Sequence, residues 1–118
     1  MSATDPNCLF CSVAAGTVPA TIVASTDAAI AFEDIAPVAP VHLLVIPRSH
    51  VPDVSAIGPE FAPVLGEVID LANKVARDRG INKTGYRLVM NVGAHAGQSV
   101  DHLHVHVLGG RKLEWPPG

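Results

Sequence analysis

Three histidines alternate with apolar residues near the C-terminal end of the sequence. They are His102, His104 and His106, and each is followed by a leucine or a valine. Because side chains alternate between the two faces of a β-strand, a strand here would place all three imidazoles on one face. Imidazole titrates near neutral pH and can act as a nucleophile, an acid, a base or a metal ligand. The pattern therefore predicts a chemical site on that face.

Two kinds of chemistry fit this row of imidazoles, and the loop before it helps to choose between them. Alternate strand residues lie about 6–7 Å apart, so the outer two histidines would lie about 13 Å apart, too far to share one ion. The loop, residues 93–99, contains Gly93, Gly97 and Ser99. Glycines allow backbone shapes that present N–H groups to an anion, and the serine adds a hydroxyl. The loop thus favours nucleophilic and acid–base work on a phosphate over a three-histidine metal centre.

The elements that must position this row are those of an α+β domain spanning residues 1–118. An amphipathic pattern at spacings of three and four predicts one long helix, and Gly16 is expected to end a short N-terminal one. Short apolar runs predict five strands, and their order favours a mainly antiparallel sheet. We expect a flexible N-terminus over 1–6 and an irregular tail over 109–118. The expected helices are 7–16 and 60–79, and the expected strands are 21–25, 28–33, 41–46, 86–92 and 100–108.

The composition excludes several classes of protein. The chain has 118 residues, of which 48% are hydrophobic and 16% charged, so it is not a disordered chain. An apolar surplus in a small domain suggests a surface buried against a partner. The net charge of −3 argues against a nucleic-acid partner. Without a membrane-length apolar run or a secretory signal, the expected location is cytoplasmic, with no membrane partner.

A Cys-x-x-Cys pair near the N-terminus, Cys8 and Cys11, has several meanings on its own. A structural disulfide is unexpected in the cytoplasm, and a redox pair would need a preceding strand and a long following helix. Two interpretations remain: half of a zinc site, or two reduced thiols packed as small apolar residues.

The histidine run together with the C-terminus carries a family resemblance. The sequence Gly-Gln-Ser-Val-Asp-His-Leu-His-Val-His-Val-Leu-Gly-Gly-Arg over 97–111 and the closing Trp-Pro-Pro-Gly over 115–118 closely resemble the histidine triad (HIT) superfamily, in particular its Hint branch. Earlier blocks at 9–10, 31–35 and 42–47 are similar as well. The resemblance implies the HIT fold, with a five-stranded sheet, one long helix and a short N-terminal helix. It also implies a homodimer joined through the long helix and the strand over 86–92, across which the sheet extends.

The resemblance implies a purine nucleoside phosphoramidase. Such an enzyme cleaves the P–N bond of AMP- or GMP-linked amines, or hydrolyses aminoacyl-adenylates, through a nucleotidyl-histidine intermediate. His104 matches the nucleophile, His106 a phosphate contact, and Ser99 a hydroxyl near the leaving group. His42 matches a histidine that orients the triad, although a buried histidine bonded to the backbone is an equal alternative. Two other functions stay open: a nucleotide sensor with incidental hydrolysis, and a dinucleoside polyphosphate hydrolase.

Nucleotide-binding and metal-binding residues are implied in the same way. In the nucleotide set, the walls around the base are Phe10, Phe32 and Ile35, and the acceptor for the ribose hydroxyls is Asp34. Asn91 bonds the ribose or the loop, and the phosphate loop contributes Gly97, Gln98, Ser99 and Val100 beside His104 and His106. Trp115 reaches the partner subunit's site. For Phe10 and Phe32, an ordinary place in the core is the alternative. The metal set is Cys8, Cys11, His50 and His102, around a structural zinc ion, with no organic cofactor. His95 has no assigned role, and Asp101 is expected to face away from the triad.

Overall fold

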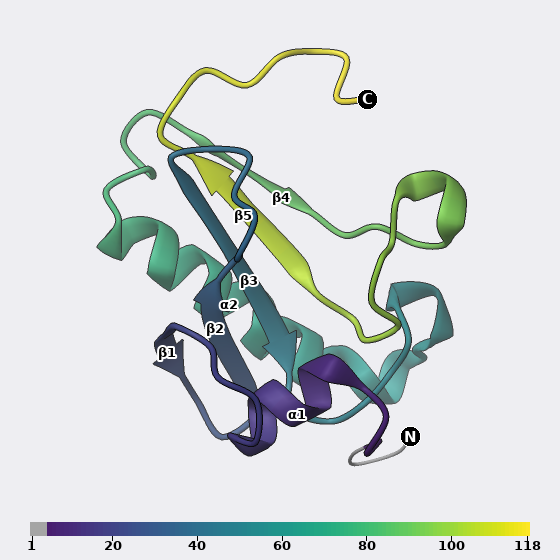
Figure 1. Cartoon of the computed structure of the whole chain (residues 1–118). Coiled ribbons are helices and arrows are strands. Elements are labelled where there is room, and N and C mark those ends of the chain that lie inside the picture. The colour runs from purple at the N-terminus through teal and green to yellow at the C-terminus, as the bar shows by residue number, and fades with distance from the viewer. Residues whose placement is uncertain (1–4) are drawn as a thin grey trace.

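A five-stranded antiparallel sheet forms the centre of the fold. A computed structural model describes residues 5–118, and residues 1–4 of the expected flexible N-terminus lie outside the described residues. The spatial order of the strands is β1-β2-β3-β5-β4, so β5 lies between β3 and the edge strand β4 (Figure 1). The predicted antiparallel sheet is confirmed. The strands are β1 (Ile22–Ser25), β2 (Ala29–Glu33), β3 (Val41–Pro47), β4 (Tyr86–Val89) and β5 (Val105–Gly109).

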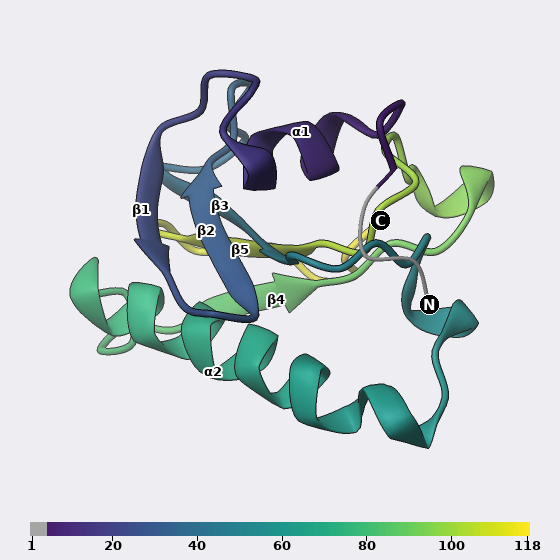
Figure 2. The ribbon, with the colours of Figure 1, turned by 90° about the horizontal axis from the view of Figure 1, so that it is seen from below.

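The long helix α2 (Ala62–Asp78) covers one face of the sheet (Figure 2). A short 3-10 turn over Pro59–Phe61 leads into it, so the helix begins slightly later than its expected start. Its apolar stripe packs on the apolar side chains of β3 and β5, which alternate with the residues that face the other way. The main core lies between this helix and the sheet: Ala29, Ala31, Leu43, Val45, Val68, Leu71, Ala72, Val75, Ala76, Ile81, Val105 and Val107.

The short helix α1 (Leu9–Ala15) lies against the opposite face of the sheet (Figure 2). The Cys8 sulfur accepts the Cys11 N–H at its start, and Gly16, with φ of 78°, ends it in the left-handed conformation. Phe10 and Val13 point from this helix into a second apolar cluster with Phe32 of β2 and neighbours from β3. Helix α1 therefore covers part of the sheet face that carries the histidines.

Two strands are shorter than the sequence predicted. β4 ends at Val89, before the expected residue 92, and β5 begins only at Val105 instead of 100. The segment before β5 stays in place through isolated hydrogen bonds to residues 47–52, such as Leu103 N–H to the Val51 carbonyl at 2.8 Å. The alternation still holds there, because Leu103 packs with Phe61 in a third apolar cluster while its histidine neighbours contact Phe10.

The C-terminal tail has no helix or strand after Gly109, which itself belongs to β5. Within residues 5–118, no helix has the length and apolar character needed to cross a membrane.

Candidate active site and metal-binding cluster

An apolar cleft of about 270 Å³ lies between α1, β2 and the start of β5. Its walls are mostly hydrocarbon, and imidazoles, a hydroxyl and carboxylates line the rest. The sequence-predicted residues that line it are Phe10, Phe32, Asp34, Ile35, Ser99, Val100, His104 and His106. The lining that sequence reasoning missed is Leu9, Val13, Val18, Pro19, Ala20, Glu33 and Leu44. Val13 lies one helical turn after Phe10, and that spacing could have revealed it.

His104 is held in one tautomer by the backbone. Its Nδ1 lies 2.7 Å from the carbonyl oxygen of His102. A carbonyl can only accept, so Nδ1 carries the proton and Nε2 keeps a free lone pair. The ring is 5% exposed and meets Phe10 edge-to-face, with the ring centroids 5.2 Å apart. The cleft therefore contains a fixed imidazole with one unprotonated nitrogen.

His106 is positioned by a hydrogen-bond chain that begins at the backbone of Val38. The Val38 N–H donates to Nδ1 of His42 at 3.1 Å, which leaves the proton of His42 on Nε2. That Nε2–H donates to Nδ1 of His106 at 2.9 Å. Nε2 of His106 must then carry the proton of its own ring. His42 is thus bonded both to the backbone and to the triad, so the two interpretations of this residue are not exclusive.

The His106 imidazole is neutral at physiological pH. Burial, followed by the nearby imidazoles of His104 and His42, lowers its pKa to about 4, although the Asp34 carboxylate acts in the opposite direction. His106 is therefore a neutral hydrogen-bond donor toward any group in the cleft.

Asp34, His42 and His106 also bring donor atoms together, with all three atoms within 4.8 Å of one another. The shared point of contact is Nε2 of His42, which lies 3.3 Å from Asp34 Oδ2. Neutral imidazole binds a metal through an unprotonated nitrogen. The Val38 N–H donates to Nδ1 of His42, so Nε2 of His42 carries the proton and cannot bind a metal. We interpret the group as a hydrogen-bonded chain rather than a metal site.

A separate cluster of two cysteines and two histidines is a candidate metal-binding site. We call Cys8, Cys11, His50 and His102 the Cys–His cluster; their four ligand atoms lie within 4.8 Å of one another. Nδ1 of His102 lies 3.3 Å from the Cys8 sulfur and 3.5 Å from the Cys11 sulfur. Nδ1 of His50 lies 3.4 Å from the Cys11 sulfur. The structure therefore brings together all four residues of the predicted metal set.

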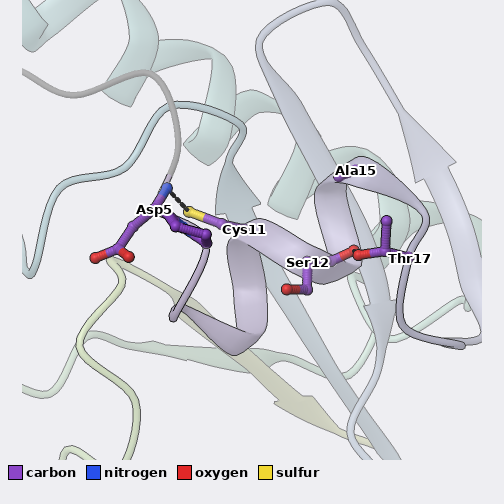
Figure 3. A pocket seen from close by; sticks show the side chains of 6 residues that line it. Asp5, Cys11, Ser12, Ala15 and Thr17 are labelled. Carbon is purple, nitrogen blue, oxygen red and sulfur yellow. Dashed lines mark hydrogen bonds between the residues drawn. The ribbon is translucent and has the colours of Figure 1, made fainter.

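The surroundings of the Cys–His cluster fit a metal ion. Nε2–H of His102 donates to the Pro47 carbonyl at 2.8 Å, which leaves the lone pair of Nδ1 facing the sulfurs. Backbone N–H groups donate to both sulfurs, from Cys11 to Cys8 at 3.4 Å and from Asp5 to Cys11 at 3.3 Å; Figure 3 shows the second of these bonds. Burial raises the pKa of the Cys11 thiol, so charge on its sulfur requires a compensating cation.

The loop over residues 93–99, here called the glycine loop, borders the cleft through Ser99. Gly93 and Gly97 both have positive φ, 82° and 87°, and flank a single 3-10 turn over Ala94–Ala96. The Gln98 side chain folds back on the loop and its neighbours rather than lining the cleft. His95 is exposed in the turn.

Several other predicted residues lie outside the cleft lining. Asn91 is half-buried, whereas Gly97 and Asp101 are exposed. Trp115 is 80% exposed and lies over the Arg87 guanidinium of edge strand β4, 6.0 Å from the ring centroid. The structure therefore does not bring Trp115 to the cleft of its own chain.

The fold, the cleft and the Cys–His cluster together define a class of protein: a small α+β protein with a histidine row beside an apolar cleft. The HIT domain family matches residues 15–113, and the chain belongs to the HIT family. It is 46% identical to an uncharacterized HIT-like protein of Synechocystis over 93% of this chain and 96% of that protein.

Solved structures agree with this assignment. A HIT family hydrolase from Legionella pneumophila has a TM-score of 0.93 at 45% identity, over 95% of this chain and all of that one. A histidine triad nucleotide-binding protein from Candida albicans has a TM-score of 0.80 at 27% identity, over 93% of this chain and 83% of that one.

Proposed function

We propose that this protein is a hydrolase of purine nucleoside 5′-phosphoramidates, in which His104 forms a nucleotidyl-histidine intermediate. The observation that carries this proposal is the bond from Nδ1 of His104 to the His102 carbonyl. It leaves the other ring nitrogen unprotonated beside a cleft lined by Phe10, Asp34 and Ser99. The names of similar structures, one a hydrolase and one a nucleotide-binding protein, support hydrolysis and nucleotide binding as the coarser part of this function.

The cleft fits the three parts of a nucleoside monophosphate. Phe10 and Phe32 offer apolar walls to the base, and the Asp34 carboxylate can accept hydrogen bonds from two ribose hydroxyls. The glycine loop reaches the cleft through Ser99, whose hydroxyl can donate a hydrogen bond to a phosphate oxygen. The phosphorus would then face His104 and His106 together, whose ring centroids are 5.1 Å apart.

The reaction proceeds in two displacements at phosphorus. In the first, the lone pair on Nε2 of His104 forms an N–P bond while the P–N bond to the amine breaks. The amine leaves with the bonding electron pair and takes a proton relayed from water through the Ser99 hydroxyl. In the second, the oxygen of a water molecule displaces His104 from phosphorus. One water is consumed, and one of its protons replaces the proton that left with the amine.

The neutral state of His106 suits this reaction. Its Nε2–H donates a hydrogen bond to a phosphate oxygen as charge develops there, without needing to be protonated. Because His42 holds the other nitrogen as the acceptor, the donor stays directed into the cleft.

We also propose that the Cys–His cluster binds a structural zinc ion. Two thiolates and two imidazoles are a complete ligand set for tetrahedral zinc and leave no open position. When bound, the ion would tie α1, His50 and His102 together and take no part in the chemistry.

Reduced thiols at Cys8 and Cys11 are consistent with the cytoplasmic location that we propose.

We further propose that the protein is a homodimer. Strand β4 is one edge of the sheet, opposite β1, and the residues after it include Met90 and Val92, which are 38% and 40% exposed. A partner joined through α2 and β4 would cover this surface. The exposed Trp115 would then reach toward the partner subunit's cleft.

The nucleophile assignment is tested by trapping the intermediate. After a brief pulse of adenosine 5′-phosphoramidate, intact and peptide mass spectrometry should show a nucleotidyl group on His104. His104→Ala should lower turnover at least about a thousandfold while keeping the circular dichroism spectrum of the folded protein.

Several outcomes would refute parts of the proposal. An adduct on another residue, or substantial turnover by His104→Ala, would refute the nucleophile. AMP binding with a turnover no faster than that of His104→Ala would indicate a sensor instead. Faster cleavage of a dinucleoside polyphosphate would indicate the third function.

A further inference from the structure

The glycine loop is placed by hydrogen bonds rather than by packing. Every residue over 92–97 is exposed, so no buried apolar contact positions the turn. Backbone bonds within the loop, such as Gln98 N–H to the Gly93 carbonyl at 3.2 Å, set its shape. They do not set its position relative to His104. A loop that is to hold a phosphate against a nucleophile needs an external anchor.

The Gln98 side chain supplies contacts in three directions. Its Oε1 accepts the Gly93 N–H at 2.9 Å, across the base of the loop. Its Nε2 donates to the Pro52 carbonyl at 2.8 Å and to the Val100 carbonyl at 3.1 Å. An amide has two N–H donors, and both are used here. The side chain therefore has no donor left for a phosphate oxygen.

Pro52 lies in a segment that also holds the histidine row. Within residues 47–52, the Pro47 carbonyl accepts Nε2–H of His102, and the Val51 carbonyl accepts the Leu103 N–H, both at 2.8 Å. The same short segment thus binds the glycine loop from one side and the residues just before His104 from the other. The Gln98 side chain connects the glycine loop to this segment.

We infer that Gln98 is a positioning residue, which sets the distance between the glycine loop and His104 by anchoring the loop to the Pro52 carbonyl. This inference rests on the proposed function, in which the loop holds the phosphate. The amide acts through the loop and does not itself touch the substrate. Its loss should weaken the binding of the phosphate and misplace the phosphorus relative to Nε2 of His104.

The first test compares Gln98→Glu with wild type. The carboxylate keeps an acceptor for the Gly93 N–H but replaces both amide donors, so an oxygen faces the Pro52 and Val100 carbonyls. Losing these bonds should lower kcat/KM by roughly 10- to 100-fold and raise the Kd of AMP by calorimetry. The control is His95→Ala, in the same exposed loop, which should stay within about twofold of wild type.

The pH dependence separates positioning from a general loss of structure. Below the pKa of the new carboxyl, which the two carbonyls should raise above the usual value of about 4.3, its O–H can donate to Pro52 again. Relative to wild type, AMP affinity of Gln98→Glu should therefore recover between about pH 8 and pH 5. Gln98→Ala should show no such recovery, and unfolding midpoints should differ little among these variants, because the loop residues 92–97 that Gln98 anchors are all exposed.

AMP affinity is measured independently of turnover, so it tests the anchor even if phosphoramidate hydrolysis is not found. The inference is overturned if Gln98→Glu binds AMP as tightly as His95→Ala does. It is also overturned if Gln98→Glu and Gln98→Ala have the same pH profile. If the wild-type protein shows no turnover but the two Gln98 variants still differ in the pH dependence of AMP affinity, the proposed function alone is refuted.

Discussion

Replacing His42 tests the hydrogen-bond chain that controls His106. His42 is 8% exposed and connects the Val38 N–H to Nδ1 of His106. His42→Asn keeps an acceptor near the Nδ1 position for Val38, but its amide is too short to reach His106. His42→Gln places its amide nitrogen where Nε2 lies and so keeps a donor toward His106. The two variants therefore separate the backbone contact from the triad contact.

The size of the expected fall in activity follows from the loss of the Nε2–H donor of His42. Leaving the His106 acceptor without a partner costs about 1–3 kcal/mol. If that cost appears in the transition state, kcat/KM falls roughly 5- to 150-fold. We expect His42→Asn to lie in this range and His42→Gln to lose clearly less, because a donor remains. The fall should appear mainly in kcat, because His106 is proposed to act on charge that develops during the reaction.

The assay is steady-state turnover of adenosine 5′-phosphoramidate, together with urea unfolding of each variant. Unfolding is needed because a change at a buried residue also affects stability. Equal activity of the two variants, with equal stability, would refute the chain as the control of His106. A change in KM alone would show that His42 acts on binding rather than on the reacting phosphate.

Two further predictions concern the pKa of His106 and the metal content of the Cys–His cluster. The imidazole of His106 should titrate by NMR with a midpoint near 4, and a midpoint near the ordinary 6.5 would contradict the burial argument. Because this pKa is lower in the folded than in the unfolded chain, the stability it contributes is present above about pH 6.5 and is lost as the pH falls through about 4, which urea midpoints can follow. Untagged protein should contain about one equivalent of zinc, and its removal by a chelator should lower Tm; less than about a tenth of an equivalent, with no effect of the chelator, would refute the site.

The alternation in the histidine run was enough to predict the two faces of β5. Val105 and Val107 are buried against α2, as the pattern required, and the imidazoles lie on the side of α1. Periodicity could not predict where regular pairing begins, because Leu103 bonds to the loop residue Val51 rather than to a neighbouring strand. Such a bond depends on the path of a distant segment and has no local signal.

The strand order and the role of Gln98 were equally hidden in the sequence. β5 follows β4 in the chain but inserts between β3 and β4, and this arrangement depends on packing of the whole sheet under α2. The family resemblance placed Gln98 along the phosphate loop. In the structure, both N–H donors of its side-chain amide bind the Pro52 and Val100 carbonyls.

The three histidines of the run share a face, yet each ring has a different hydrogen-bond partner. The Pro47 carbonyl binds Nε2–H of His102 and leaves Nδ1 for the sulfurs, whereas the His102 carbonyl binds Nδ1–H of His104 and leaves Nε2 for the cleft. His42 donates to Nδ1 of His106, so that ring presents a proton instead of a lone pair. A repeat of identical residues thus presents a lone pair to the sulfurs, a lone pair to the cleft and an N–H to the cleft, because each ring meets a different partner on its second nitrogen. Moving any one of these partners would change the chemistry at its histidine without changing the histidine itself.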